Sequence, residues 1–462
     1  MSKAVILAAG SGSRLRKLHR SPVKPLVKVL GVTLVERQLR ALTNLAGLDE
    51  VIVVVGCEAD AVRDRIERSA PWPFVVRAVE NPDWERGNGD SLYAAKEWVE
   101  GENFFVLMVD HLFEPGTIER FAAEAGEGPG LAVSTGRIQT LNLDDATKVR
   151  IDDCGRIRAL GKDLADFTAV EMGLFQLDGR IFPALERAFQ EGEYSLTSGV
   201  QRFVEKSPLC AVPLSCSWFD IDTRQELRQA EGYLLSQIPS GRDGLVAKYL
   251  NRKLSLPLSR RLANLGVKPA HITVCAFAMS LLSGALFALG FPLPAGLIAQ
   301  ASSVVDGMDG EVARMRGMAT RFGAFIDALL DRLGEGAVLV GLSLLALSSA
   351  PGLLTFVLAA LAILVSPLSM EVKDRYYVVY NRIYVPEDRD RWTRFLLANH
   401  DGRMVLVCLG GIFSVPRLTL ALLVGLGLVQ TAYRVWQIRR IDRTQSVGTQ
   451  ADSASREDLD QR

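Results

Sequence analysis

The sequence predicts a doubly wound α/β domain followed by an all-α membrane domain of about six transmembrane helices. Three observations lead to this prediction. Residues 4–8 form an apolar run directly before a glycine-rich turn, and strand-like and helix-like segments then alternate. Residues 272–435 contain long apolar runs separated by short charged patches. Because 462 residues are too many for one ordinary core, two domains are expected.

Composition sets the predicted boundaries and excludes some classes of protein. We expect the α/β domain over residues 1–235, a linker over 236–243, the membrane domain over 244–443 and a disordered polar tail over 444–462. The net charge is formally zero, so no nucleic-acid partner is predicted. The six cysteines form no C-x-x-C pair and the four histidines show no zinc spacing, so these residues predict neither a disulfide framework nor zinc.

The first half alternates between strand and helix patterns. The run over residues 4–8 is typical of a strand buried on both faces of a sheet. In chain order there follow a helix over 32–46, a strand over 51–55, a helix over 59–69 and a strand over 104–109. This alternation predicts a parallel, doubly wound sheet, in which ligands bind at the carboxyl ends of the strands.

Polar residues follow the first and last of these strands. In the turn after residue 8, Gly10 and Gly12 can bring backbone N–H groups to phosphates, with Lys24 adding positive charge. Asp110 directly follows a strand, and Asp220 and Asp222 precede a predicted helix, so these carboxylates can hold Mg²⁺ against a triphosphate. Each feature also has a purely structural interpretation, such as a tight turn or a helix cap.

Taken together, residues 7–15 and the sequence Lys24-Pro25-Leu26 resemble the signature of the sugar-phosphate nucleotidyltransferases. The resemblance covers residues 3–235 and includes residues 87–91 and Gly173, although Val23 replaces the proline usual before the lysine. It implies the following roles: nucleotide binding by Ala8, Ala9, Gly10, Gly12, Asn88 and Gly89, phosphate neutralisation by Arg14 and Lys24, contact with the phosphoalcohol by Lys162, and metal binding by Asp110, Asp220 and Asp222.

The second half contains six candidate membrane spans. They cover residues 272–291, 292–305, 322–347, 353–370, 404–415 and 418–435, and several are shorter than the roughly 20 residues that cross a bilayer. Basic residues concentrate in alternate connections, so the positive-inside rule places both termini in the cytoplasm. The sequence therefore predicts an integral cytoplasmic-membrane protein with both active sites on the cytoplasmic side.

Four aspartates form the strongest chemical pattern in the chain. Asp306 and Asp309 share a helix face with residues 310 and 313, and Asp327 and Asp331 share a face of the next helix. Carboxylates that converge at an apolar boundary repel one another unless cations neutralise them, which predicts Mg²⁺, or alternatively Mn²⁺. The competing interpretation is that the aspartates face water and pair with nearby arginines.

The pattern D-x-x-D-G-x-x-A-R-x8-G-x3-D-x3-D, present here without substitution, resembles the motif of the CDP-alcohol phosphotransferases. The resemblance covers residues 242–440, with Ala270 in place of the usual asparagine. It implies that Asp306, Asp309, Asp327 and Asp331 ligate metal ions and that Asp331 also serves as general base. It further implies a CDP site lined by Gly310, Ala313 and Arg314.

The fusion of these two domains resembles the family of bifunctional CTP:inositol-1-phosphate cytidylyltransferases and di-myo-inositol-phosphate-phosphate synthases. This resemblance implies that the first domain makes CDP-inositol from CTP and inositol 1-phosphate, and that the second transfers phosphoinositol to another inositol phosphate. Two alternatives stay open: a lipid alcohol as the acceptor, or a non-catalytic, nucleotide-sensing first domain. Apolar helices also allow a homodimer.

Overall fold

The computed structural model describes residues 2–12, 23–99, 101–135, 146–238, 246–382, 384–385 and 389–460. Contacts divide the chain into two compact units, Met1–Leu234 and Leu235–Arg462. The division falls at the start of the predicted linker, most of which lies outside the described residues. The phosphate-binding residue predicted at Arg14 also lies outside them.

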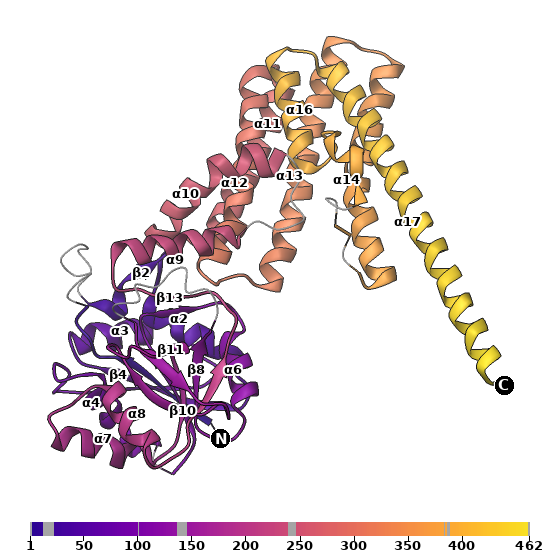
Figure 1. Cartoon of the computed structure of the whole chain (residues 1–462). Helices are drawn as coiled ribbons and strands as arrows, with labels where there is room; N and C mark the ends of the chain where they lie inside the picture. The colour runs from indigo at the N-terminus through magenta and orange to yellow at the C-terminus, as the bar shows by residue number, and fades with distance from the viewer. Residues whose placement is uncertain are drawn as a thin grey trace. The chain divides into compact units, whose positions relative to one another are not determined.

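The first unit is built on a mixed sheet, in which the described residues contribute nine strands in the order β10-β9-β11-β6-β1-β4-β5, with β8 beside β11 and β12 beside β8 (Figure 1). The parallel centre consists of β1 (Ser2–Ala8), β4 (Leu48–Val55), β5 (Val75–Glu80) and β6 (Phe104–Met108). The remaining strands are β8 (Gly130–Ser134), β9 (Lys148–Ile151), β10 (Ile157–Gly161), β11 (Ala169–Leu177) and β12 (Cys210–Pro213).

The prediction of a wholly parallel sheet is wrong, because β11 runs antiparallel to β6, β8 and β9. The pair formed by β9 and β10 is antiparallel as well, and its short connection explains its direction. Strands β9 and β10 are joined by a turn in which Asp152 accepts hydrogen bonds from the backbone N–H groups of Cys154 and Arg156, both at 2.9 Å. A short turn reverses the chain direction, whereas parallel neighbours need a longer crossover.

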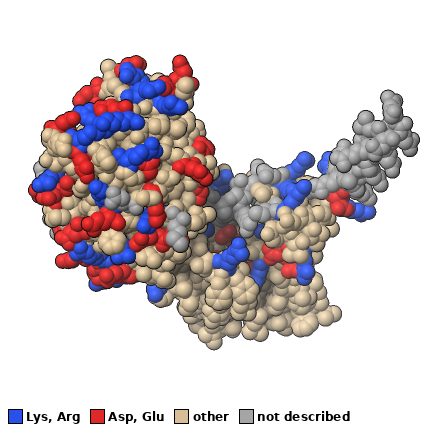
Figure 2. All heavy atoms as spheres, turned by 90° about the horizontal axis from the view of Figure 1, so that it is seen from below, with Lys and Arg blue, Asp and Glu red and all other residues tan. Residues whose placement is uncertain are grey.

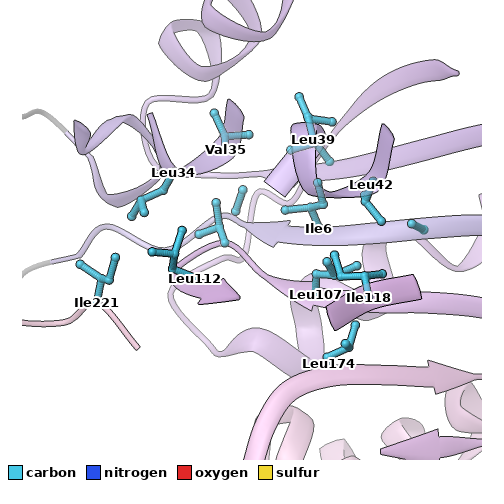
Figure 3. Packing of buried hydrophobic residues seen from close by; sticks show 14 of the residues in the cluster. Ile6, Leu34, Val35, Leu39, Leu42, Leu107, Leu112, Ile118, Leu174 and Ile221 are labelled. Atoms are coloured by element: carbon cyan, nitrogen blue, oxygen red, sulfur yellow. The ribbon is translucent and has the colours of Figure 1, made fainter. Parts of the chain in front are cut away.

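Helices cover both faces of the sheet, as expected of a doubly wound fold. One face carries α2 (Leu34–Ala41), α3 (Ala59–Arg68), α6 (Thr117–Ala125) and α9 (Arg224–Ser236), and the other carries α4 (Asn88–Ala94), α7 (Ile181–Gln190) and α8 (Leu196–Val204). Side chains of β1 alternate between the two cores, Ile6 entering one and Leu7 the other. Figure 3 shows Ile6, Leu107 and Leu174 of the sheet beneath Leu39 and Leu42.

Helix α2 begins at Leu34, two residues after the start predicted from its apolar pattern. Thr33 and Glu36 form a capping box, in which the Glu36 carboxylate accepts the backbone N–H of Thr33 at 3.1 Å. This cap satisfies backbone donors that the first helical turn leaves without partners, so it fixes the beginning of the helix. Residues 32–33 instead form β3 (Val32–Thr33), which pairs with β2 (Lys28–Val29).

The second unit is helical (Figure 1). A π-helical turn, η3 (Ala247–Asn251), leads into α10 (Arg252–Leu265), α11 (Pro269–Ala288), α12 (Pro292–Met315), α13 (Arg321–Ser349) and α14 (Leu353–Tyr380). After the turn η4 (Arg391–Phe395) come α16 (His400–Ile412) and α17 (Pro416–Asp460). Helix α17 continues to Asp460, whereas the sequence predicts a disordered tail from residue 444. Residues 416–440 already form a long helix, and extending an existing helix is much less costly than starting one, so the polar residues that follow continue it.

Helices stand at all six predicted spans, but the count of six membrane crossings is not confirmed. Among the described residues, three helical segments are long and apolar enough to cross a membrane by length and composition, Pro269–Ala288, Leu353–Tyr380 and Pro416–Arg440. Helices α12 and α13 carry the acidic motif, and α16 has only 13 residues. Figure 2 shows interspersed charges over the first unit and broad uncharged areas on the second.

Glycines let the helices of the second unit approach closely. A Cβ atom built on Gly341 of α13 would lie 2.0 Å from the backbone oxygen of Gly284 on α11. A Cβ atom on Gly284 would lie 2.4 Å from the backbone oxygen of Ala337. Neither position has room for a side chain, so these glycines set how closely α11 and α13 pack.

Candidate active sites

A cavity of about 340 Å³ opens at the carboxyl end of β1 in the first unit. Its wall includes Ala9, Gly10 and Gly12 of the glycine-rich turn, together with Lys24 and Asp110. A Cβ atom on Gly12, whose φ is +62°, would lie 2.5 Å from the Lys24 Cβ atom. The turn therefore needs glycine at this position, both for its backbone conformation and for its contact with Lys24.

The ammonium group of Lys24 lies between two carboxylates. Its Nζ atom donates to Asp110 Oδ2 and to Asp222 Oδ1, and the side chains of all three residues are largely buried. Burial by itself lowers the pKa of Lys24, but the charges of Asp110 and Asp222 outweigh it and raise the pKa above its usual value. Lys24 is therefore a fixed positive charge at the cavity wall.

A second group of side chains could hold a cation. Asp110, His111 and Asp220 each offer one ligand atom, and the three atoms lie within 4.8 Å of one another. The predicted metal ligands Asp110 and Asp220 are thus brought together, whereas Asp222 contacts Lys24 instead. The sequence reasoning missed His111, whose Nδ1 atom lies 2.8 Å from Asp110 Oδ1.

Trp218 and Gly173 both lie close to the ring of His111 and restrict its position. The ring stacks on Trp218 with ring centroids 5.4 Å apart, because β7 (His111–Phe113) pairs with β13 (Trp218–Asp220). A Cβ atom on Gly173 would lie 2.8 Å from the Cδ2 and Nε2 atoms of the imidazole. Gly173 also has a φ of +68°, which favours glycine. These contacts explain the glycine that the family resemblance indicated at this position.

Burial and neighbouring charges shift the titration of this cluster. Burial raises the pKa of Asp220 to about 6, and the negative charge of Asp110 adds to the rise. For His111, burial alone lowers the pKa, but Asp220 and Asp110 overcome this and raise it to about 9. Burial also raises the pKa of Glu171, on β11, to about 7. Shifts of this kind concentrate where groups are arranged for chemistry.

The predicted nucleotide-binding residues do not all line the cavity. Asn88 lines the cavity, and its Oδ1 atom accepts a 2.7 Å hydrogen bond from the backbone N–H of Leu196. Gly89 packs against the backbone oxygen of Tyr194, which leaves no room for a Cβ atom, and Ala8 lies in the hydrophobic core. Lys162 is absent from the residues that line the cavity, although its charge acts on Glu171.

Trp84 is a cavity residue that the sequence reasoning missed. A Cβ atom on Gly56, which directly follows β4, would lie 2.6 Å from the Trp84 side chain. The indole therefore packs against bare backbone at the end of the neighbouring strand. A lone tryptophan in a loop gave no signal of this role, because its place depends on a contact 28 residues away along the chain.

The acidic motif of the second unit forms a compact cluster. Asp306 on α12 and Asp327 and Asp331 on α13 each offer one carboxylate oxygen, and the three oxygens lie within 4.8 Å of one another. Asp309, the fourth predicted ligand, accepts hydrogen bonds from the Thr273 hydroxyl and from the backbone N–H of Gly310. The structure thus brings three of the four aspartates together directly, with Asp309 held beside them.

Both clusters fit a divalent cation. Asp220 Oδ1 and Asp327 Oδ1 are buried and have no hydrogen-bond partner in the described parts of the chain. An unpaired buried carboxylate oxygen is unfavourable, and a bound cation would satisfy it. Carboxylate oxygens are the preferred ligands of Mg²⁺, so the donor atoms at both clusters suit this ion.

The region predicted to receive CDP lies beside the second cluster. A Cβ atom on Gly310 would lie 3.2 Å from the Arg314 guanidinium, while Ala313 is half-buried on the same helix. The neighbouring Glu311 is buried and accepts hydrogen bonds from Ser255 and Ser259 of α10, at 2.7 and 2.6 Å. Glu311 therefore joins α12 to α10. The helix face that carries Gly310 is not used for this contact and can bind a ligand.

Comparisons with known proteins agree with this division. The family described as the MobA-like NTP transferase domain matches residues 4–206, and the CDP-alcohol phosphatidyltransferase family matches residues 267–429. The chain is 35% identical over 444 residues to a bifunctional IPC transferase and DIPP synthase of Rubrobacter xylanophilus, covering 95% of this chain and 96% of the relative.

A second relative with the same name, from Aquifex aeolicus, is 33% identical over 445 residues, covering 94% of this chain and 98% of the relative. Among solved structures, the inositol-1-phosphate CTP transferase from T. maritima aligns with 50% of this chain and 94% of its own length. Its sequence identity is 24% and the TM-score is 0.46.

Proposed function

The chain belongs to the family of bifunctional IPC transferases and DIPP synthases, and we propose that it catalyses two consecutive reactions, one in each unit. It is an enzyme with a nucleotidyltransferase domain and a CDP-alcohol phosphotransferase domain. In the first reaction CTP and inositol 1-phosphate give CDP-inositol and pyrophosphate. In the second, phosphoinositol is transferred to another inositol phosphate and CMP is released. The observation that carries the proposal is the pair of separate carboxylate clusters, one in each unit.

In the first reaction a phosphate oxygen of inositol 1-phosphate attacks the α-phosphorus of CTP. The cavity beside Lys24 receives the nucleotide, with Gly10 and Gly12 near its phosphates, Asn88 near its base and Arg14 adding positive charge. Mg²⁺ bound at the Asp110 cluster would neutralise phosphate charge. Lys162 would contact the incoming phosphate, as the family resemblance implies. Positioning and charge neutralisation then account for most of the catalysis.

In the second reaction the acceptor hydroxyl attacks the phosphorus that carries the inositol, and CMP leaves. Asp306, Asp309 and Asp327 would hold Mg²⁺ or Mn²⁺ together with Asp331, and the metal would neutralise the diphosphate. Asp331 would also accept the proton of the attacking hydroxyl. Arg314 beside Gly310 would face the phosphates of CDP.

The second unit associates with membranes, as its apolar helices and its family indicate. We place both active sites on the cytoplasmic side. The support is the clustering of basic residues in alternate connections of the second unit and the location of CTP in the cytoplasm.

The test uses the detergent-solubilised full-length protein with CTP, Mg²⁺ and inositol 1-phosphate, and follows the products by phosphorus NMR. The parent should release pyrophosphate and form a phosphodiester. Asp331→Ala should accumulate CDP-inositol, and Asp110→Ala should form none. Asp60→Ala is a matched control, because this aspartate is fully exposed and pairs with Arg63 on the surface.

Each outcome has a distinct meaning. A parent that releases no pyrophosphate contradicts the first reaction, and a parent that stops at CDP-inositol contradicts the second. Product that partitions into organic solvent would replace the inositol phosphate acceptor with a lipid alcohol. CDP-inositol formation by Asp110→Ala at the rate of Asp60→Ala would show that the Asp110 cluster is not the first active site.

A further inference from the structure

The first residue of α16 faces the aspartate cluster of the second unit. His400 lines a small pocket that Asp306 of α12 and Asp331 of α13 also line. Thr273 of α11, which donates to Asp309, is part of the same wall. An imidazole thus shares a pocket with two of the carboxylates that the second reaction requires.

The far side of this imidazole is held by a buried glutamate. His400 Nδ1 lies 3.1 Å from Glu335 Oε2, and Glu335 is only 5% exposed. The same carboxylate accepts hydrogen bonds from Arg403 Nε and, at 2.8 Å, from Arg403 Nη2. Ser366 on α14 donates its hydroxyl to Glu335 Oε1. Glu335 is therefore fixed by residues of two further helices.

Arg403 already balances the charge of Glu335. Its guanidinium reaches both oxygens of the carboxylate, which is the strongest geometry for such a pair. Glu335 thus does not require the imidazole for neutralisation. The effect of the contact is on His400, whose ring orientation it fixes.

The contact also fixes which ring nitrogen carries the proton of neutral His400. A carboxylate that accepts from Arg403 and Ser366 is ionised and can only accept, so His400 Nδ1 must be the donor. In the neutral imidazole the lone pair then lies on Nε2, on the opposite edge of the ring. The carboxylate–imidazole pair resembles in arrangement those that orient histidines in other active sites.

The backbone around His400 is tied down as well. Asn251 and Ser303 donate to Asp401 Oδ1, at 2.9 and 3.0 Å, which joins the start of α16 to η3 and α12. A Cβ atom on Gly402 would lie 2.6 Å from the Cα atom of Leu397, so the entry to this helix tolerates only glycine there. His400 therefore stands on a rigid support at the edge of the aspartate pocket.

We propose that His400 is a further residue of the second active site, and that its Nε2 atom accepts a hydrogen bond from a hydroxyl of the acceptor other than the attacking one. This contact positions the attacking hydroxyl beside Asp331, which accepts its proton. This inference rests on the proposed function, because it concerns the acceptor of the same transfer. Asp331 keeps its role as the base, and Glu335 is a positioning residue that acts through His400.

The test compares His400→Asn with His400→Gln in the full-length protein. Asparagine can still donate to Glu335 from the Nδ1 position but has no atom at the Nε2 position. Glutamine reaches the Nε2 position and gives up the bond to Glu335. With CDP-inositol supplied directly, His400→Asn should raise the KM for inositol phosphate about tenfold, as the loss of one hydrogen bond implies. The KM for CDP-inositol should stay within about twofold of the parent value.

His400→Gln should retain a KM for inositol phosphate closer to the parent value, even if the protein is less stable. An asparagine variant that performs better than the glutamine variant, or that matches the parent, would overturn the inference. So would an equal rise in the KM for CDP-inositol, because it would place His400 at the nucleotide. Pyrophosphate release in the first reaction serves as the internal control. A parent that forms CDP-inositol but transfers nothing would contradict the proposed function, and the inference with it.

Discussion

Replacing Gly173 with alanine tests whether the imidazole of His111 must lie where the structure places it. A Cβ atom at this position would lie 2.8 Å from the imidazole and 3.0 Å from the Met108 side chain. Trp218 is stacked on one face of the imidazole and limits how far the ring can move. The alanine should therefore push His111 away from Asp110 and disturb the candidate metal site of the first unit.

The size of the effect has two parts. Alanine in the left-handed region destabilises a protein by roughly 1–2 kcal/mol, and overpacking a tight site adds about 1–3 kcal/mol. Gly155 provides the matched control, because its φ of +74° is similar and a Cβ atom there would meet nothing within 4 Å. We expect Gly155→Ala to cost about 1–2 kcal/mol and Gly173→Ala about 2–5 kcal/mol.

The assay uses the full-length protein in detergent. Unfolding of the first unit is followed in urea by pulse proteolysis, and pyrophosphate release reports the first reaction. Gly173→Ala should reduce pyrophosphate release at least about tenfold, whereas Gly155→Ala should retain it. Transfer from supplied CDP-inositol should be the same in both variants. If both alanine variants lose equal stability and keep equal rates of pyrophosphate release, the contact between Gly173 and His111 has no role and the reasoning is refuted.

Three further predictions follow from charge and packing. Arg434→Met removes the ion-pair partner of the fully buried Asp390 and should destabilise the second unit by roughly 3–5 kcal/mol. Arg375→Met breaks an exposed pair with Glu371 and should cost only about 0–1 kcal/mol. Thermal unfolding in detergent measures both losses of stability. His111 has a folded-state pKa of about 9, above the value of about 6.5 in an unfolded chain, so its stabilisation is complete below pH 6.5 and is lost as the pH rises through 9. In EDTA, His111→Gln should therefore show a smaller loss of first-unit stability between about pH 7 and 9.5 than the parent, and equal slopes would contradict this pKa. Gly341→Ala should abolish the second reaction and leave the rate of the first unchanged, because the added Cβ would lie 2.0 Å from a backbone oxygen of α11. Gly336→Ala on the same helix is the control. A Cβ atom there has no neighbour within 4 Å, so this variant should behave like the parent.

Much of the second site could be predicted because its spacing is helical. Asp327 and Asp331 are four residues apart, so a single helix brings their carboxylates to one face. The same reasoning did not foresee that Asp309 contacts Thr273, because that contact depends on how α11 packs against α12. It also did not find Glu335 or His400, because 65 positions of the chain separate these residues, which meet only through helix packing.

For the first site, the sequence predicted only those features that follow from individual strands. The apolar run of β1 and the aspartate after β6 indicated the correct edge of the sheet. The sequence did not indicate His111, because its position depends on stacking against Trp218. That contact exists only because β7 pairs with β13, which is distant in the sequence. The antiparallel half of the sheet was missed for a similar reason. Its strands β9 and β10 are short and joined by a tight turn, so this stretch lacks the strand–helix–strand pattern that predicts parallel pairing.

The regular spacing along α13 has a consequence for which genetic changes the chain can accept. Asp327, Asp331 and Glu335 follow one another at intervals of four, and each interval advances about 6 Å along the helix. A codon inserted between the first two would turn every later residue by about 100°, and would carry the carboxylates to different sides of the helix. A codon inserted between residues 316 and 320, in the connection that precedes α13, would only lengthen the connecting turn. Length variation among descendants of this chain should therefore occur in the connection and be excluded from the first half of α13.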